Sequence, residues 1–491
     1  MRNHLENRPT PRHPIHEPPS ATWAAHEFGP ASLPDERLRR RLILMATQFG
    51  EHPSATIPEA CGDWPSAKAA YRFFDNEAVE SQALLAAHHQ ATLERIKTHP
   101  VVLVPQDTTA FTFSPHPPTQ GLGPIGDQVD GPQGLLMHHA LALTEGGEPL
   151  GVIFAKFWAR DPADFHKAQK RYERTLEEKE SGKWLAGWRA TEAVARQVPQ
   201  TQFISIGDRE GDVYEVLQAA VETDCPNVGL LVRLRHNRKV KSAAADESSE
   251  PPWGKLDACL RSQPVAATLR IQVPRQEDQP ARPAVLEVRF CALTLHVPKR
   301  KPHLPALPVY AVEARETDPP NGVEAICWQL LTTRPVTTAQ EAIRCVKWYA
   351  KRWQIEVFHK VLKSGCQVEQ RQLGTAERLQ RMLGVYVVVA WRILALTIAA
   401  REHPELPVSI WLAEAEWQTL ACWAKSAPTP PKQPPTVKAA VLWIAKLGGF
   451  LARKGDGQPG PICLWRGLRR LRDLTSGFML AVSLNARRRC G

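Results

Sequence analysis

The sequence predicts a mixed α/β protein with helical regions at both ends, and three observations support this class. Residues 21–100 show the apolar spacing of helices and little sign of strands. The apolar runs "VVLV" at 101–104 and "FISI" at 203–206 each indicate a buried strand that ends near an aspartate. Beyond residue 335 helical patterns return. The order strand, hairpin, helix, strand, helix, strand in the middle of the chain is typical of a mixed sheet covered by helices.

The chain divides into regions by pattern and composition. The segment "DERLRRRLILMATQF" at 35–49 places acidic residues before basic and apolar ones at helical spacing, which predicts a helical module with basic faces. A solvated charged face is the alternative. The "EGGEP" segment at 145–149 separates two apolar runs and predicts a hairpin. The expected regions are a disordered tail 1–20, a helical domain 21–100, an α/β domain 101–400 with a β-rich insertion at about 240–335, and a helical region 401–491 with a Pro-rich linker 427–436.

The charge of the chain favours a polyanionic partner. The 491 residues carry a formal net charge of +11, with an isoelectric point near 9.2. Phosphates attract Lys and Arg whatever the base sequence, so nucleic acid is the partner that this balance favours. A merely basic globular protein is the alternative.

The cysteines and the apolar segments indicate in which cellular compartment the protein is expected and whether it spans a membrane. The ten cysteines include no CxxC pair, which argues against a zinc site or a disulfide framework and fits a reducing cytoplasm. Residues 1–20 contain no apolar signal core. The segment "MLGVYVVVAWRILALTIAA" at 382–400 is nearly long enough to span a bilayer, but Arg392 lies inside it. We therefore expect a buried core helix, with a membrane span as the alternative, and no membrane partner.

The segment "YAKRWQIEVFHKVLK" at 349–363 predicts a helix with one unusual polar stripe. Thr338 and Glu341 form a candidate capping box at its start, and Gly365 is a candidate end. At about 100° per residue, four polar side chains fall within an arc of about 60°. These four are Tyr349, Arg352, Glu356 and Lys363. The apolar side is expected to serve the core through Ile343, Val346, Trp353, Val357 and Val361.

Three carboxylates suggest a metal site. Asp107 and Asp208 follow the two predicted strands, and Glu356 lies in the polar stripe. Carboxylate oxygens are the ligands that Mg²⁺ prefers, and two such ions can serve in-line phosphoryl transfer. Chance is the alternative for the triad, because the chain has 51 acidic residues, and a surface ion-pair ladder is the alternative for the stripe.

The chain resembles the DDE transposases of bacterial insertion sequences that carry a Tyr-Arg-Glu-Lys signature, a group that includes the transposon-five transposase. The signature spacing Y-x2-R-x3-E-x6-K is intact from Tyr349 to Lys363. Further similar segments follow in order between about residues 22 and 480. They are "YRFF" at 71–74, "DTT" at 107–109, "ESGKWLAGW" at 180–188, "DREGD" at 208–212, "WQLLTTRPV" at 328–336 and "LGGF" at 447–450.

The resemblance implies a catalytic triad on a ribonuclease-H-like core. Asp107, Asp208 and Glu356 would bind Mg²⁺, with Mn²⁺ as a substitute, and the β-rich insertion would lie between the second and third of them. The implied DNA contacts are Tyr349, Arg352, Lys363, Trp328, Arg233 and Arg235. Among these, Trp328 would stack on a base flipped out near the cleavage site, since stacking offsets part of the unstacking cost. A core tryptophan is the alternative.

The resemblance also implies a function. The chain would be a cut-and-paste transposase that hydrolyses transposon ends, forms and opens a hairpin, and transfers the ends into target DNA. Region 21–100 would recognise double-stranded DNA ends, and region 401–491 would form a homodimer in the DNA complex. The implied location is the bacterial cytoplasm, at the nucleoid. The alternative is a catalytically inactive or repurposed DNA-binding protein. A glycosidase with paired carboxylates explains neither the charge nor the stripe.

Overall fold

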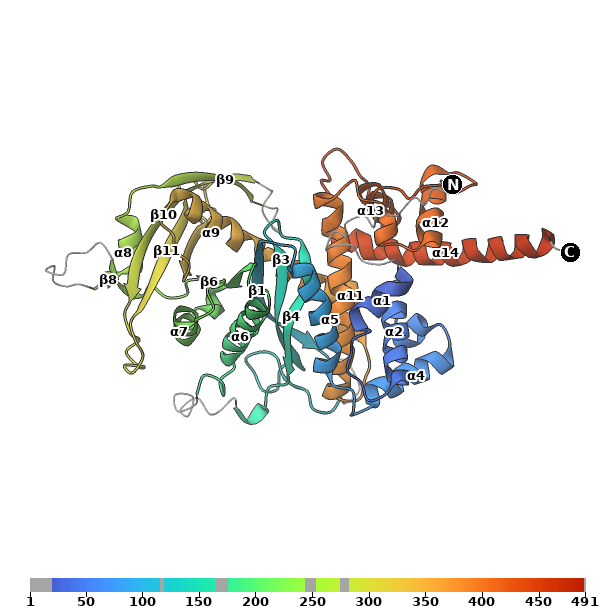
Figure 1. Cartoon of the computed structure of the whole chain (residues 1–491), viewed down its shortest axis with the longest axis horizontal. Coiled ribbons are helices and arrows are strands. Elements are labelled where there is room, and N and C mark those ends of the chain that lie inside the picture. Colours follow the sequence, from blue (N-terminus) through green and yellow to red (C-terminus); the bar gives the residue numbers. More distant parts are fainter. Residues whose placement is uncertain (1–19, 115–118, 165–174, 243–252, 274–281, 490–491) are drawn as a thin grey trace, which may run out of the picture.

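The computed structural model describes residues 20–114, 119–164, 175–242, 253–273 and 282–489. The expected disordered tail 1–20 lies outside the described residues except for Ser20, which begins the first helix. Figure 1 shows a large sheet on one side, helices from both ends of the chain on the other, and helix α11 between them. The mixed α/β class with helical end regions is confirmed, including its ribonuclease-H-like sheet.

Five helices form the N-terminal region. Three of them begin at side-chain caps, which satisfy backbone N–H groups that have no partner within the helix. Asp35 accepts from the Leu38 backbone N–H at 2.9 Å, and Asp63 caps the fourth helix in the same way. The helices are α1 (Ser20–Phe28), α2 (Glu36–Glu51), α3 (Ile57–Cys61), α4 (Trp64–Asp75) and α5 (Ser81–Ile96).

The central sheet has five main strands in the order β4-β3-β1-β5-β6. Strand β1 runs antiparallel to β3 and parallel to β5, and β5 runs parallel to β6. The hairpin predicted at "EGGEP" is confirmed as the β3–β4 connection. The strands are β1 (Val101–Thr112), β2 (Gly123–Pro124), β3 (Gln133–Thr144), β4 (Pro149–Trp158), β5 (Gln202–Gly207) and β6 (Val228–Arg233).

Helices cover both faces of this sheet, so its strands are buried on both sides. Leu103 of β1 packs in the cluster that contains the side chains of α11. Its neighbours Val102 and Val104 pack on the opposite face, in the cluster formed with α6 (Gly182–Gln197) and α7 (Tyr214–Glu222). This alternation follows from the two-residue period of a strand. It explains why "VVLV" is a continuous apolar run.

The segment 234–338 that follows β6 extends the same sheet instead of forming a separate one. The order continues as β6-β12-β11-β10-β7-β8, and β9 pairs with the other end of β10. The elements are β7 (Lys239–Ser242), β8 (Gly254–Lys255), α8 (Leu256–Arg261), β9 (Ala267–Val273), β10 (Arg282–Leu295), β11 (Leu307–Glu316) and β12 (Cys327–Thr332).

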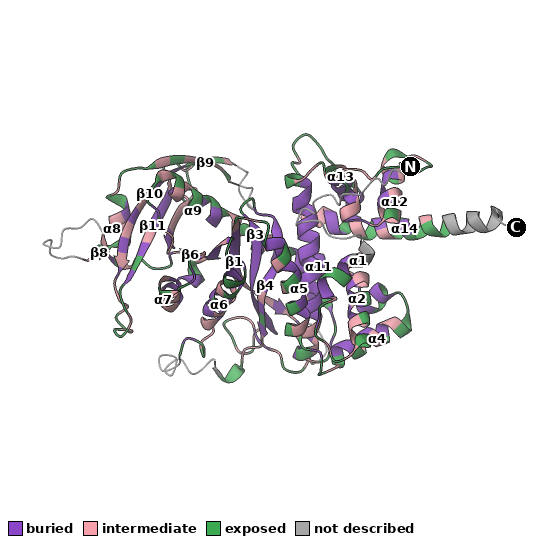
Figure 2. Cartoon of the chain, viewed as in Figure 1, coloured by how far each residue is buried: buried purple, intermediate pink, exposed green. Residues whose placement is uncertain are grey.

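The C-terminal half is helical and is organised around α11 (Ala376–Glu402). In its most apolar window 94% of the residues are buried, and Figure 2 shows the helix buried along most of its length. Arg392 donates to the Trp411 carbonyl at 2.6 Å and lies over the Trp23 ring. These contacts confirm a core helix, not a membrane span. The other elements are α9 (Ala339–Lys351), α10 (Trp353–Lys360), α12 (Glu414–Lys425), α13 (Val437–Leu447), α14 (Pro461–Arg489), and the short helices η1 (Pro162–Asp164), η3 (Arg209–Gly211), η4 (Val361–Gly365), η5 (Val368–Gln370) and η6 (Val408–Ile410).

Candidate active site and nucleic-acid interface

The two aspartates lie where the parallel pair β1 and β5 stops pairing. The parallel register ends at Pro105 opposite Ile206, and Asp107 and Asp208 each lie two residues further along the chain. Asp208 caps η3 by accepting from the Glu210 backbone N–H at 2.8 Å. The expectation that Asp107 lies past the end of its strand is wrong. Strand β1 continues to Thr112 because its second half pairs with β3 alone.

Glu356 lies on α10, in a helical segment that is interrupted twice. The capping box of Thr338 and Glu341 is confirmed at the start of α9. The single regular helix that the pattern predicts is wrong, because α9 ends at a turn at Arg352 and α10 runs into the π-helical turn η4. Local changes in winding of this kind preserve the overall periodicity of the sequence, and π-helical turns occur frequently at functional sites.

Arg352 connects two of the three carboxylates. Its Nη1 lies 3.4 Å from Asp107 Oδ2, and its Nη2 donates to Glu356 Oε1 at 2.5 Å. Burial, with smaller contributions from the charges of Asp208 and Glu356, raises the pKa of Asp107 to about 6. The Thr108 backbone N–H and Arg352 act in the opposite direction. The three carboxylates therefore share one electrostatic neighbourhood.

The donor chemistry at this site suits a hard divalent cation, since three carboxylates supply only oxygen ligands. Among the residues that the structure describes, however, no group of three or more His, Cys, Asp or Glu side chains is arranged to hold a metal ion. The Arg352 guanidinium provides the positive charge between Asp107 and Glu356. A metal held by the triad therefore requires Arg352 to change its partners.

The predicted DNA contacts fall into two groups. Trp328 of β12 is half-buried and packs edge-on against Tyr349, with ring centroids 5.4 Å apart; Tyr349 itself is only 5% exposed. Arg233 donates to the Cys327 carbonyl at 3.2 Å, next to Trp328. These side chains form one cluster. Two further residues lie outside this cluster. Lys363 of η4 lies over the Phe111 ring of β1 at 5.7 Å, and Arg235 is exposed in the loop after β6.

Trp353 is a candidate contact that the sequence analysis missed. We expected it in the core, and this is wrong, since the side chain is 59% exposed. Helix α10 begins at Trp353, directly after the turn at Arg352. The Trp353 side chain faces away from the core. A signal was available in the sequence. At 100° per residue, Trp353 lies only about 60° from Glu356 around the helix, within the polar side.

A buried polar network supports β1 directly before Asp107. Gln106 Nε2 donates to Ser205 Oγ at 2.7 Å, and its Oε1 lies 3.2 Å from His138 Nε2. The other ring nitrogen of His138 lies 2.9 Å from Thr108 Oγ1. Burial lowers the pKa of His138 well below its usual range, so the ring is neutral near pH 7. The network connects β1, β3 and β5 and fixes the backbone that carries Asp107.

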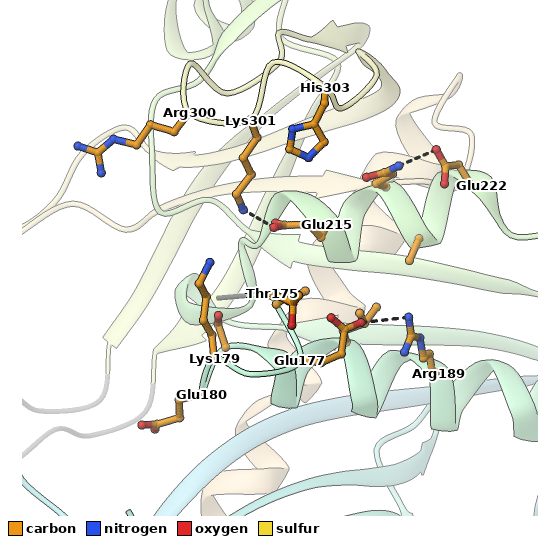
Figure 3. A pocket seen from close by; sticks show the side chains of 15 residues that line it. Thr175, Glu177, Lys179, Glu180, Arg189, Glu215, Glu222, Arg300, Lys301 and His303 are labelled. Carbon is orange, nitrogen blue, oxygen red and sulfur yellow. Dashed lines mark hydrogen bonds and ion pairs between the residues drawn. The ribbon is translucent and has the colours of Figure 1, made fainter. Parts of the chain in front are cut away.

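One described pocket lies away from the carboxylates. It has a volume of about 1070 Å³ and opens between α6, α7 and the loop that carries Lys301. Figure 3 shows Lys301 reaching Glu215 of α7, and Arg189 pairing with Glu177 at 3.4 Å. The pocket contains none of the predicted site residues, and these four of its charged side chains already pair with one another.

Comparison with known families identifies the two ends of the chain. The family described as Transposase DNA-binding matches residues 20–79, which comprise α1 to α4 and most of the loop before α5. The family described as Transposase Tn5 dimerisation domain matches residues 388–486, from within α11 into α14. The two matches lie in this order around the mixed sheet. They indicate a Tn5-like transposase.

The matches support DNA binding and homodimer formation by this transposase. The first match includes α2, whose surface carries Arg37, Arg40 and Arg41. The second match begins inside the buried helix α11 and not at the expected region boundary of 401. The dimerisation region therefore shares its first helix with the core of the sheet domain.

Proposed function

We propose that this transposase is a cut-and-paste enzyme whose phosphoryl-transfer centre consists of Asp107, Asp208 and Glu356. The observation that carries the proposal is their convergence. Asp107 lies on β1, Asp208 directly follows β5 and Glu356 lies on α10, and the latter two carboxylates both raise the pKa of Asp107. A region with this much negative charge is costly unless cations are bound there. In a transposase, divalent cations bound at such a carboxylate cluster would serve phosphoryl transfer.

When bound by these carboxylates, Mg²⁺ ions (or Mn²⁺) would activate the attacking oxygen and stabilise the leaving oxygen. In the proposed sequence, water first cleaves each transposon end and frees a 3′ hydroxyl. This hydroxyl attacks the opposite strand to form a hairpin, a second water opens the hairpin, and the 3′ end then attacks target DNA. All four steps exchange one phosphodiester oxygen for another, so one centre can serve them in turn.

The surrounding residues would place the DNA. Arg352 and Lys363 would neutralise backbone phosphates, which positions a strand without reading its bases. Tyr349, Trp328 and Arg233 form one contiguous group with a half-buried aromatic face on which an unpaired base could stack. The exposed Trp353 adds a second aromatic surface on the other side of Arg352 in the sequence.

The alternative is a transposase-derived protein that binds DNA without cutting it. The ion pairs from Arg352 to Asp107 and Glu356 favour this alternative, since they occupy oxygens that a metal would need. The two functions differ in whether Arg352 leaves the carboxylates when DNA is bound.

The test uses purified protein and a plasmid that carries the gene with several hundred flanking base pairs, in the presence of Mg²⁺. Wild type is compared with Glu356→Ala and with Glu94→Ala, a control that removes a carboxylate exposed on α5. We expect excision by wild type and control, and binding without cleavage by Glu356→Ala. DNA binding without cleavage by all three proteins would favour the non-catalytic alternative. Equal cleavage by all three would show that the triad is wrong.

A further inference from the structure

The second aspartate of the "DREGD" segment has a different role from the first. The Asp212 side chain is fully buried, and its two oxygens accept from one short stretch of chain. Oδ2 accepts from the Arg235 backbone N–H at 3.0 Å, and Oδ1 accepts from Arg238 Nε at 3.1 Å and Nη2 at 2.5 Å. The Asp212 carbonyl accepts from the same guanidinium at 3.0 Å. Both carboxylate oxygens of Asp212 are therefore occupied by hydrogen bonds from the loop that follows β6.

This loop, residues 234–238 between β6 and β7, is named the basic loop. It is held on its other side as well, because the Leu256 N–H donates to the Arg238 carbonyl at 3.0 Å. The Asp257 N–H donates to Asn237 Oδ1 at 3.1 Å. Although the loop is held by hydrogen bonds on both sides, its Arg235, His236 and Asn237 are exposed. Hydrogen bonds fix the Arg235 N–H, the Arg238 carbonyl and the Asn237 side chain, so this surface loop is preorganised.

The basic loop begins beside Asp208. Strands β5 and β6 are parallel, and Gly207 pairs with Val232. Asp208 and Arg233 are the next residues along these neighbouring strands, so the loop starts at the edge of the sheet where the carboxylates lie. Among the described residues, the loop cation that forms an internal ion pair is Arg238. Arg238 neutralises Asp212 and lies 5.8 Å from the Tyr214 ring centroid.

We propose that Asp212 is a positioning residue: it fixes the basic loop so that the exposed Arg235 is held beside Asp208 for a DNA phosphate. The inference rests on the proposed function for the identity of the ligand, a phosphodiester of the DNA strand at the active site. Arg238 is part of the support and not a phosphate ligand. Asp212 is likewise not a metal ligand, since both of its oxygens already accept hydrogen bonds from the loop.

The first test measures DNA affinity as a function of salt. Wild type, Asp212→Asn, Arg235→Ala and the double variant bind a fluorescent DNA duplex that carries a transposon end, in EDTA so that no cleavage occurs. The control is Asp224→Asn, which removes the same charge from an exposed aspartate paired with Arg196. Loss of a negative charge alone would strengthen binding to DNA, so the control separates this effect from the loss of positioning.

We expect Asp212→Asn to weaken binding about tenfold and to reduce the slope of log affinity against log salt by about 1, as expected for one lost phosphate contact. Arg235→Ala should do the same, and the double variant should be no weaker than either single variant. Affinity and slope like those of the Asp224→Asn control, or additive losses in the double variant, would overturn the proposal.

A second variant covers the case in which Asp212→Asn fails to fold. Asn237→Ala loosens the exposed side of the loop without leaving a buried charge unpaired. It should lower the salt slope in the same direction and should increase tryptic cleavage at Arg235 and Arg238. An unchanged slope together with faster cleavage would overturn the link between loop order and DNA binding.

The outcome is separable from that of the proposed function. If wild type binds DNA but never cleaves it, while Asp212→Asn lowers the slope, the positioning role stands and the proposed catalysis fails. If wild type cleaves and Asp212→Asn matches the control in affinity, slope and cleavage, catalysis stands and the positioning role fails.

Discussion

Replacing Asp107 with Asn should stabilise the metal-free protein at neutral pH while removing cleavage. Burial and two nearby carboxylates raise the pKa of Asp107, so its ionised form is disfavoured in the folded state. An amide has nearly the same shape and carries no charge. The variant therefore removes a destabilising charge that, in the proposed function, is needed only when a cation is bound.

The size of the effect follows from the pKa. A rise from 3.8 to about 6 corresponds to about 3 kcal/mol, at about 1.4 kcal/mol per pKa unit. For a carboxyl whose folded pKa is raised, this unfavourable contribution is absent below the unfolded pKa. It grows as the pH rises from about 3.8 to about 6 and is constant above that. For a protein of 491 residues we expect a gain of roughly 3 °C in melting temperature at pH 8 and almost none at pH 4.

The assay is thermal unfolding in EDTA at several pH values between 4 and 8, with Asp127→Asn as an exposed control. The difference in melting temperature between Asp107→Asn and wild type should rise with pH and level off above about 6. A difference that does not depend on pH, or a variant less stable than wild type at pH 8, would refute the reasoning about the buried charge.

Four further changes have distinct expected outcomes. Adding Mg²⁺ should raise the melting temperature of wild type but not that of Asp107→Asn, because only a protein that binds the ion gains from mass action. Glu27→Gln should cost about 3–5 kcal/mol in thermal unfolding, because the fully buried Glu27 carboxylate accepts from Arg95 at 2.6 Å and 3.2 Å. Gly187→Ala should cost about 1–3 kcal/mol, because a Cβ there would lie 2.1 Å from Gln106 Oε1. Trp353→Ala should leave stability nearly unchanged and weaken DNA binding by about 1–3 kcal/mol in a fluorescence titration, the usual worth of one base stacked on an aromatic ring.

Each structural change has a matched control. Glu36→Gln removes an exposed carboxylate of α2, Gly477→Ala adds a methyl group to α14 where nothing lies within 4 Å, and Trp423→Ala removes a half-exposed tryptophan of α12. A loss in a control as large as in its partner variant would contradict the corresponding explanation.

The sequence predicted those features that depend on local patterns. The β3–β4 hairpin follows from "EGGEP" between apolar runs, and the start of α9 follows from the Thr338–Glu341 capping box. The buried α11 follows from its length with Arg392 inside it. In each case the residues that decide the structure are neighbours in the chain, so a sequence contains the whole signal.

Features that depend on partners could not be predicted in the same way. The length of β1 beyond Asp107 is set by pairing with β3, so a strand that seems to end at "VVLV" continues. The turn at Arg352 that separates α9 from α10 lies in a segment whose periodicity is that of a regular helix, so the sequence pattern did not show it. The bridge from Arg352 to Asp107 joins residues 245 positions apart, and no spacing rule specifies it.

Helix α11 makes the chain hard to divide into independent modules. In its first half, the Arg381 side chain donates to the carbonyls of Phe74 and Val79, at the end of the DNA-binding match. Its middle donates from Trp391 to the Pro149 carbonyl of β4, and its second half packs on α13 and α14. A fragment that starts at residue 388, where the dimerisation match begins, would cut this helix in two and expose side chains from all three regions. Shuffling of such regions between relatives would then succeed only if the whole of α11 moved with its neighbours.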